Sequence, residues 1–268
     1  MKIIKVVDAL EQFAPLPLQE DFDNAGLQVG LTEADVSGAL LCLDVNELIV
    51  DEAIALGCNL IVAHHPLIFH KLAHITDENY VQRSVIKALQ NGITIVAMHT
   101  NMDNAMGGVN FKIAEKMKLT DVHFFGSVRQ YSTPGSEKAV DYASGVIGTF
   151  EESQAADDFI IMLKRTFDVE CVQANQLLRR EIRRVAICGG AGAFLLPDAV
   201  KAGADAFVTG EMHYHEFFDH EQEIQIAVIG HYQSEQFTNE IFQSIIEERC
   251  PGVKCYLTKV NTNPIIYL

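Results

Sequence analysis

Two short segments of the chain place a carboxylate four residues after a histidine. The first is His99-Thr-Asn-Met-Asp103 and the second is His231-Tyr-Gln-Ser-Glu235. On the first turn of a helix, residues i and i+4 share a face, and the helix dipole favours a negative charge there. A carboxylate can also bridge two cations. Either pair alone is compatible with an ordinary helix start, but the recurrence of the pattern favours a metal site.

The adjacent histidines His64 and His65 are a third candidate, because they end a short apolar run and precede Pro66. Neighbouring side chains on a strand point to opposite sides. A tight turn at Pro66 would let both rings face one cavity or let each serve a different metal. A hydrogen-bonded turn without metal is the plain alternative. Two metals about 3.5–4 Å apart, held by histidines and bridging carboxylates, would activate a water for hydrolysis.

The elements that must position these residues recur in two halves of the sequence. The first half predicts a strand over 38–44, a helix over 47–56 and strands over 59–63 and 93–98, and the second predicts a strand over 185–188, a helix over 197–202 and strands over 205–209 and 224–229. Residues of metal-ligand type follow strands in both halves, where open α/β sheets bind their ligands. We therefore predict an α/β fold of two similar units with mixed sheets, produced by internal duplication.

The boundary between the halves is predicted near 125–143, because the stretch 132–136 (Ser-Thr-Pro-Gly-Ser) is rich in turn-forming residues. We assign residues 1–130 to the first unit and 131–268 to the second, with the metal site between them. A helix over 151–168 is predicted to pack on the second unit.

A glycine-rich turn, Gly189-Gly190-Ala191-Gly192, follows one strand and precedes a helix. Its backbone N–H groups could cradle a phosphate, and a plain turn is the alternative. The dinucleotide-binding fingerprint fails, because Leu195 stands where its third glycine belongs. The candidate substrate contacts are Gly189, Gly190, Gly192 and His213. His213 could instead support a metal ligand.

Composition narrows the possible partners. The chain has 268 residues, with 20 Lys+Arg against 36 Asp+Glu and a net charge of −16. This charge argues against non-specific nucleic-acid binding and against a polybasic membrane contact. The first residues show no signal-peptide pattern, so we expect no secretion signal, and the sequence contains no apolar run of membrane-spanning length. Six scattered cysteines without a Cys-x-x-Cys pair predict a reduced, cytoplasmic chain. Four of them lie in apolar runs and are predicted to be buried, namely Cys42, Cys58, Cys171 and Cys188.

Five motifs occur in order: DFDNAGLQVG over 21–30, HHPLIF over 64–69, HTNMD over 99–103, the glycine turn over 189–192 with TGEMH over 209–213, and GHYQSE over 230–235. Together they resemble the NIF-three-like family of dinuclear metal proteins, whose members often bear the name type 2 GTP cyclohydrolase I. The likeness covers residues 21–267. Phe22 stands where the family usually has Trp, and the chain resembles the short form, which lacks an inserted domain.

The resemblance implies properties that residue spacing does not. It implies two divalent ions, iron, zinc or similar, bound by His64, His65, Asp103, His231 and Glu235. It implies intertwined three-layer α/β/α units and a toroidal homohexamer. The implied reaction is hydrolysis of GTP to formate and dihydroneopterin triphosphate.

Two classes of function follow from these residues. In the first, the chain is a metal-dependent hydrolase whose metal-bound hydroxide attacks a small-molecule substrate such as a nucleotide, and His99 or Glu211 moves protons. In the alternative, the chain is a metal-handling or regulatory protein, such as a metal chaperone or insertion factor, without steady turnover. A ring acting on nucleic acid is least compatible with the charge of −16.

Overall fold

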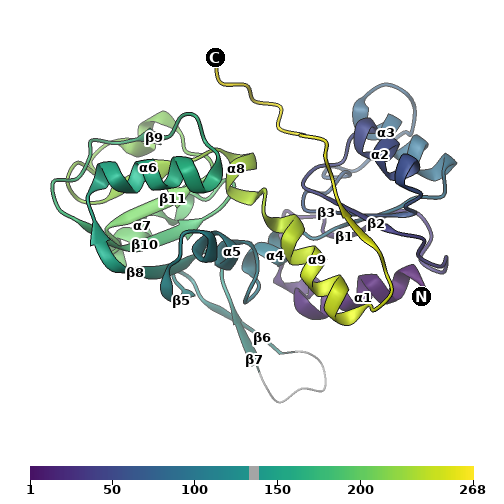
Figure 1. The fold of residues 1–268 in the computed structure, drawn as a ribbon, viewed down its shortest axis with the longest axis horizontal. Coiled ribbons are helices and arrows are strands. Elements are labelled where there is room, and N and C mark those ends of the chain that lie inside the picture. Colours follow the sequence, from purple (N-terminus) through teal and green to yellow (C-terminus); the bar gives the residue numbers. More distant parts are fainter. Residues whose placement is uncertain (133–138) are drawn as a thin grey trace. The chain divides into compact units, whose positions relative to one another are not determined.

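The computed structural model describes residues 1–132 and 139–268, which form two compact units (Figure 1). Unit 1 comprises Met1–Met102 and Thr238–Pro264, and unit 2 comprises Asp103–Phe237 and Ile265–Leu268. In the described ranges no helix combines the length and apolar character needed to cross a membrane.

Unit 1 is built on a five-stranded mixed sheet in the order β1-β4-β3-β2-β13. Its strands are β1 (Gly26–Val29), β2 (Ala39–Cys42), β3 (Leu60–Ala63), β4 (Thr94–Ala97) and β13 (Cys255–Leu257). The central strands β2, β3 and β4 run parallel and are buried along their whole length. This burial explains why their sequences are continuous apolar runs instead of alternating patterns.

The sheet of unit 1 is joined by helices, and capping residues in the sequence explain where α2 and α3 begin and where α2 ends. They are α1 (Ile3–Phe13), η1 (Leu16–Leu18), α2 (Glu47–Leu56), α3 (Tyr80–Gln90) and α9 (Thr238–Arg249). The side chain of Asn46 accepts hydrogen bonds from two N–H groups in the first turn of α2, and that of Asn79 accepts one from the N–H of Gln82 in α3. Gly57 ends α2 in the left-handed conformation, with φ of 69°.

Unit 2 is built on a six-stranded mixed sheet in the order β5-β8-β10-β11-β12-β9. Its strands are β5 (Thr120–Phe124), β8 (Val146–Gln154), β9 (Gln173–Ala174), β10 (Ile182–Cys188), β11 (Ala206–Thr209) and β12 (Gln225–Val228), and β6 (Arg129–Ser132) and β7 (Ala139–Tyr142) form a separate hairpin. Its helices are α5 (Val109–Lys116), α6 (Ala156–Phe167), η2 (Ala193–Leu195), α7 (Leu196–Lys201), η3 (Tyr214–Phe217) and α8 (His231–Glu235). The short helix α4 (Thr100–Asn104) contains the division between the units. Figure 1 shows α6 lying across the sheet.

The two sheets share a four-strand frame. The order β1-β4-β3-β2 in unit 1 matches β9-β12-β11-β10 in unit 2, with three parallel strands and one antiparallel edge strand in each. Gly203 follows α7 with φ of 69°, the same value that Gly57 has after α2. The α/β class with mixed sheets is confirmed. Duplication stays a prediction, and this shared frame is what a duplication would leave.

The observed units differ from the predicted ones in where the chain divides. The predicted boundary near 125–143 falls on β6 and β7, which belong to unit 2, and residues 133–136 of the predicted turn lie outside the described residues. The chain then returns to unit 1 near its end, because β13 pairs with β2 and α9 packs against α1. Such long-range pairing leaves no local signal in the sequence.

Two smaller predictions are wrong. Residues 151–154 extend strand β8 and do not begin a helix, so that α6 starts only at Ala156. Cys171 is exposed, whereas Cys42, Cys58 and Cys188 are buried as predicted.

Candidate metal centre

Three histidines lie together at the carboxyl ends of β3 and β4 in unit 1. His64 and His65 directly follow β3, and His99 follows β4 after one residue. The ring centroids of His64 and His65 are 4.9 Å apart, and each lies 5.3 Å from the centroid of His99. One ring nitrogen from each lies within 4.8 Å of the other two. The three rings could therefore hold a metal ion.

A hydrogen-bond acceptor holds the Nδ1 atom of each of these rings. Nδ1 of His64 lies 2.9 Å from the carbonyl oxygen of Met98. Nδ1 of His65 lies 2.7 Å from Oδ1 of Asp44, and Nδ1 of His99 lies 2.7 Å from Oδ1 of Asp23. Because a carbonyl or carboxylate oxygen accepts only from N–H, Nδ1 carries the proton and the lone pair is left on Nε2. This is how proteins orient and activate a metal-binding histidine.

The two supporting carboxylates are held in their ionised form. Burial by itself raises the pKa of Asp23, but its hydrogen bond and charge attraction with His99, together with hydrogen bonds from Thr100 and Asn24, lower that pKa to about 2. Burial also raises the pKa of Asp44, and its contacts with His65 and the hydroxyl of Thr262 lower it overall. Both side chains therefore act as acceptors near neutral pH.

Unit 2 carries a second set of ligand-type residues on α4 and α8. His231 begins α8 and Glu235 ends it, with His231 Nε2 lying 3.1 Å from Glu235 Oε2. A carboxylate oxygen of Asp103 lies within 4.8 Å of one of Glu235. Nδ1 of His231 lies 2.9 Å from Oε1 of Glu211, so this ring is held in the same way as those of unit 1. Glu211 thus positions His231.

The glycine-rich turn packs against this second set. A Cβ atom on Gly190 would lie 2.3 Å from Oε1 of Glu235, and its φ of +58° also favours glycine. The N–H groups of Gly189, Gly190 and Gly192 donate to side chains of the fold. Their acceptors are Asn110, Ser234 and Thr209 respectively. The role of the turn as a phosphate contact stays a prediction, and these hydrogen bonds favour a structural role.

The donor set fits a divalent transition metal. Four imidazoles are held through Nδ1, which makes Nε2 the ring nitrogen that a metal would coordinate, and Asp103 and Glu235 supply carboxylate oxygens. Nitrogen and oxygen donors of this kind suit zinc, iron and similar ions. The clusters could thus bind metal, as the sequence predicted.

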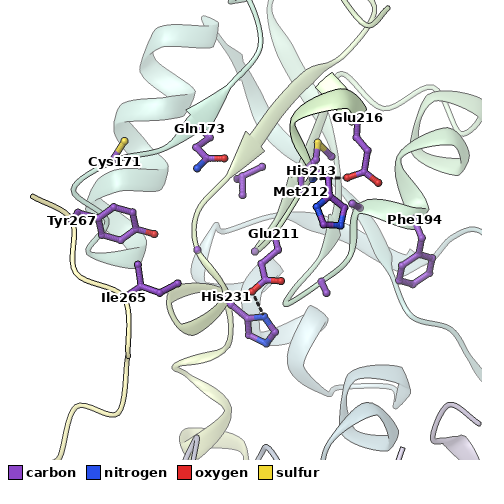
Figure 2. A pocket seen from close by; sticks show the side chains of 15 residues that line it. Cys171, Gln173, Phe194, Glu211, Met212, His213, Glu216, His231, Ile265 and Tyr267 are labelled. Atoms are coloured by element: carbon purple, nitrogen blue, oxygen red, sulfur yellow. Dashed lines mark hydrogen bonds and ion pairs between the residues drawn. The ribbon is translucent and has the colours of Figure 1, made fainter. Parts of the chain in front are cut away.

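A cavity of about 460 Å³ adjoins His231 within unit 2. Glu211 and His213 line it, and Figure 2 shows both together with the hydrogen bond between Glu211 and His231. His213 is also the N-cap residue of the short helix η3, and its backbone N–H donates to Glu216. The predicted substrate residue His213 therefore lies in a cavity, although its role stays a prediction.

The sequence identified the ligand-type residues but not the aspartates that hold the histidine rings of unit 1. His99 was expected to move protons, and the structure places it with His64 and His65 as a third ligand-type ring. Asp23 and Asp44 received no role, although Asp44 follows β2 at the same sheet edge at which His64 follows β3. That shared position was the signal that could have identified Asp44.

The fold and this donor set define an α/β protein with histidine and carboxylate clusters at its strand ends. The family model for Duf34/NIF3 (NGG1p interacting factor 3) matches residues 1–264, and the chain belongs to this family. A relative from Clostridium perfringens is 33% identical over 236 residues, covering 88% of this chain and 87% of that protein. One from Lactococcus lactis subsp. lactis is 31% identical over 268 residues, covering 98% of both. Both are named GTP cyclohydrolase 1 type 2 homolog.

Solved structures share the fold. The Staphylococcus aureus hypothetical protein SA1388 aligns with a TM-score of 0.89 and 26% identity, over 100% of this chain and 99% of that one. A Bacillus cereus protein related to NIF3 aligns with a TM-score of 0.86 and 24% identity over the same shares. The alignment with a Bacillus subtilis relative runs over 365 positions, so it includes residues that this chain of 268 lacks. A short form without an inserted segment is expected to align in this way.

Proposed function

We propose that the chain is a dinuclear metal hydrolase that acts on a small molecule. The observation that carries this function is the hydrogen-bonded Nδ1 of four histidines, because it makes Nε2 the ring nitrogen that a metal would bind. Acceptors that hold the other ring nitrogen of a histidine in this way are a regular feature of metal sites. When bound, the two ions would supply Lewis acidity and lower the pKa of a water.

We assign His64, His65, Asp103, His231 and Glu235 as the ligands of two divalent ions, iron, zinc or similar. The structure describes the ligand set of each unit by itself, and we propose that both sets complete one centre. Three ligand-type residues in one unit are few for two ions, whereas the combined sets are sufficient. Support also comes from the family, since the same motifs carry the resemblance to dinuclear proteins.

The chain's own residues then divide the remaining tasks. Asp23 fixes Nδ1 of His99, so that Nε2 of this ring is the atom that binds a metal or exchanges a proton. Glu211 holds His231 through one oxygen, and its side chain also lines the cavity (Figure 2). A carboxylate at that place can accept a proton from a substrate and return it.

GTP is the substrate that we would test first, because the relatives are named GTP cyclohydrolase 1 type 2 homolog. The measurement is formate release with metal content on protein purified without chelator. We expect two ions per chain and formate release that stops when the metal is removed. Asp103→Ala and Glu235→Ala should lower both values, while Asp158→Ala, at an exposed site on α6, should leave both unchanged.

Other outcomes lead to different conclusions. Metal without formate release would favour another hydrolysis or the metal-handling alternative, and absence of metal would contradict the ligand assignment. We further propose a homohexamer, on the resemblance alone, and a cytoplasmic location, on the scattered cysteines. Its particle mass in solution should be near six times 29.7 kDa, and a particle of 29.7 kDa would exclude it.

A further inference from the structure

The cavity beside His231 has a chemistry that the metal ligands do not explain. Fifteen residues line it, all of them in unit 2. None of these described lining residues is a lysine or an arginine, whereas Glu211 and Glu216 both face it. Apart from a metal bound at His231, these side chains give the cavity no cation, and its two carboxylates repel a phosphate group. The cavity therefore favours a ligand group that is uncharged and donates hydrogen bonds.

Both carboxylates are already fixed in place. Oε1 of Glu211 bonds Nδ1 of His231 at 2.9 Å. Oε2 of Glu216 accepts the N–H of His213 at 2.6 Å. Each side chain thus uses one oxygen to hold its position, and the second oxygen can accept an N–H from a ligand. Acceptors held in advance select a partner more sharply than mobile ones, because less side-chain freedom is lost on binding.

Aromatic and apolar side chains supply the rest of the lining. Phe194 is 63% exposed and Tyr267 is 37% exposed, so each offers a ring face to a ligand. Figure 2 shows Tyr267 on one side of Glu211 and Phe194 on the other. Rings of this kind stack on flat heterocycles. The last residues of the chain contribute directly, because Tyr267 and Ile265 belong to unit 2 although the segment before them belongs to unit 1.

We propose that this cavity binds an uncharged heteroaromatic ring through its N–H donors, and that phosphate groups of a nucleotide stay outside it. The inference rests on the proposed function and names the part of the substrate that unit 2 holds. Glu216 is the specificity residue, since its free oxygen matches a ring N–H beside an exocyclic amine. Guanine has such an edge, whereas the corresponding ring nitrogen of adenine is an acceptor and would face the carboxylate unfavourably.

The test is equilibrium dialysis of the metal-loaded full chain with guanosine, adenosine and inorganic tripolyphosphate. We expect guanosine to bind at least tenfold more tightly than adenosine. We expect tripolyphosphate to leave guanosine binding unchanged, with metal content checked afterwards to exclude chelation. Glu216→Gln should weaken guanosine binding about tenfold and reduce the preference over adenosine. Glu152→Gln, at an exposed site on β8, is the matched control.

A second variant guards against a folding defect in the first. Removal of residues 265–268 takes away Tyr267 and Ile265, and it should weaken guanosine binding while thermal stability stays within a few degrees of the full chain. Absence of guanosine binding, or its displacement by tripolyphosphate, would overturn the inference. These readouts are independent of turnover. Guanosine binding without formate release would refute only the GTP reaction, and formate release with competing tripolyphosphate would refute only the base pocket.

Discussion

The two units place different residues at equivalent strand ends. After β3, unit 1 has His64 and His65, whereas after β11 unit 2 has Gly210 and Glu211. After β2, unit 1 has Asp44, which holds His65, whereas after β10 unit 2 has the turn around Gly190. The same arrangement of strands therefore positions two different sets of residues. Unit 1 fills its sheet edge with imidazoles and their acceptors, and unit 2 keeps space there for Glu235 and a cavity.

Gly190→Ala is the change expected to have the largest effect on this difference. The new Cβ would approach Oε1 of Glu235 to 2.3 Å and would sit at a φ of +58°. We expect bound metal per chain to fall by more than half, as measured by elemental analysis. Gly203→Ala is the matched control, because Gly203 has a φ of +69° and open space around it. Equal metal loss in both variants would mean that backbone strain, and not the approach to Glu235, is responsible.

Asp44→Ala tests the imidazole side of the comparison. Loss of the acceptor for Nδ1 frees the ring and tautomer of His65, and such supports are typically worth about 10–100-fold in metal affinity. The expected result is a loss within that range in a chelator competition titration. Unchanged affinity would show that His65 is not held for a metal. Asp51→Ala, at an exposed carboxylate on α2, serves as the control.

Glu211→Ala should have a smaller effect on metal affinity than Asp44→Ala. Both remove the acceptor for an Nδ1 atom, but the Glu211 side chain is 54% exposed and that of Asp44 is 36% exposed, and water can replace an exposed acceptor more easily. The same titration gives the comparison. A larger loss in Glu211→Ala would indicate that Glu211 binds metal itself, in addition to positioning His231.

Cysteine labelling gives the mildest test, because it changes no residue. Cys171 is exposed at the cavity of unit 2, whereas Cys42 is buried in the sheet of unit 1 and burial raises its pKa well above the usual range. Iodoacetamide at pH 8 should label Cys171 first, as read by peptide mass spectrometry. Burial also raises the pKa of Cys255 to about 11, so it should react later. Early labelling of Cys42 would contradict the described core.

The elements and site residues that could be predicted from the sequence were those that depend on local residue patterns. Continuous apolar runs located the parallel strands, and polar residues at their ends located His64, His99 and His231. The aspartates that hold the histidine rings could not be predicted, because each is distant in sequence from its partner. Asp23 lies 76 residues before His99, and Asp44 lies 21 residues before His65. The return of β13 to unit 1 was hidden for the same reason, since strand pairing depends on partners that periodicity does not identify.

The metal assignment would be tested most directly by an anomalous diffraction map of crystals grown from protein purified without chelator. We predict two peaks per chain. Each should lie within bonding distance of an Nε2 atom of His64, His65 or His231, and the carboxylate of Asp103 or Glu235 should also contact a peak. Peaks at other residues, or none in protein that hydrolyses its substrate, would contradict the assignment.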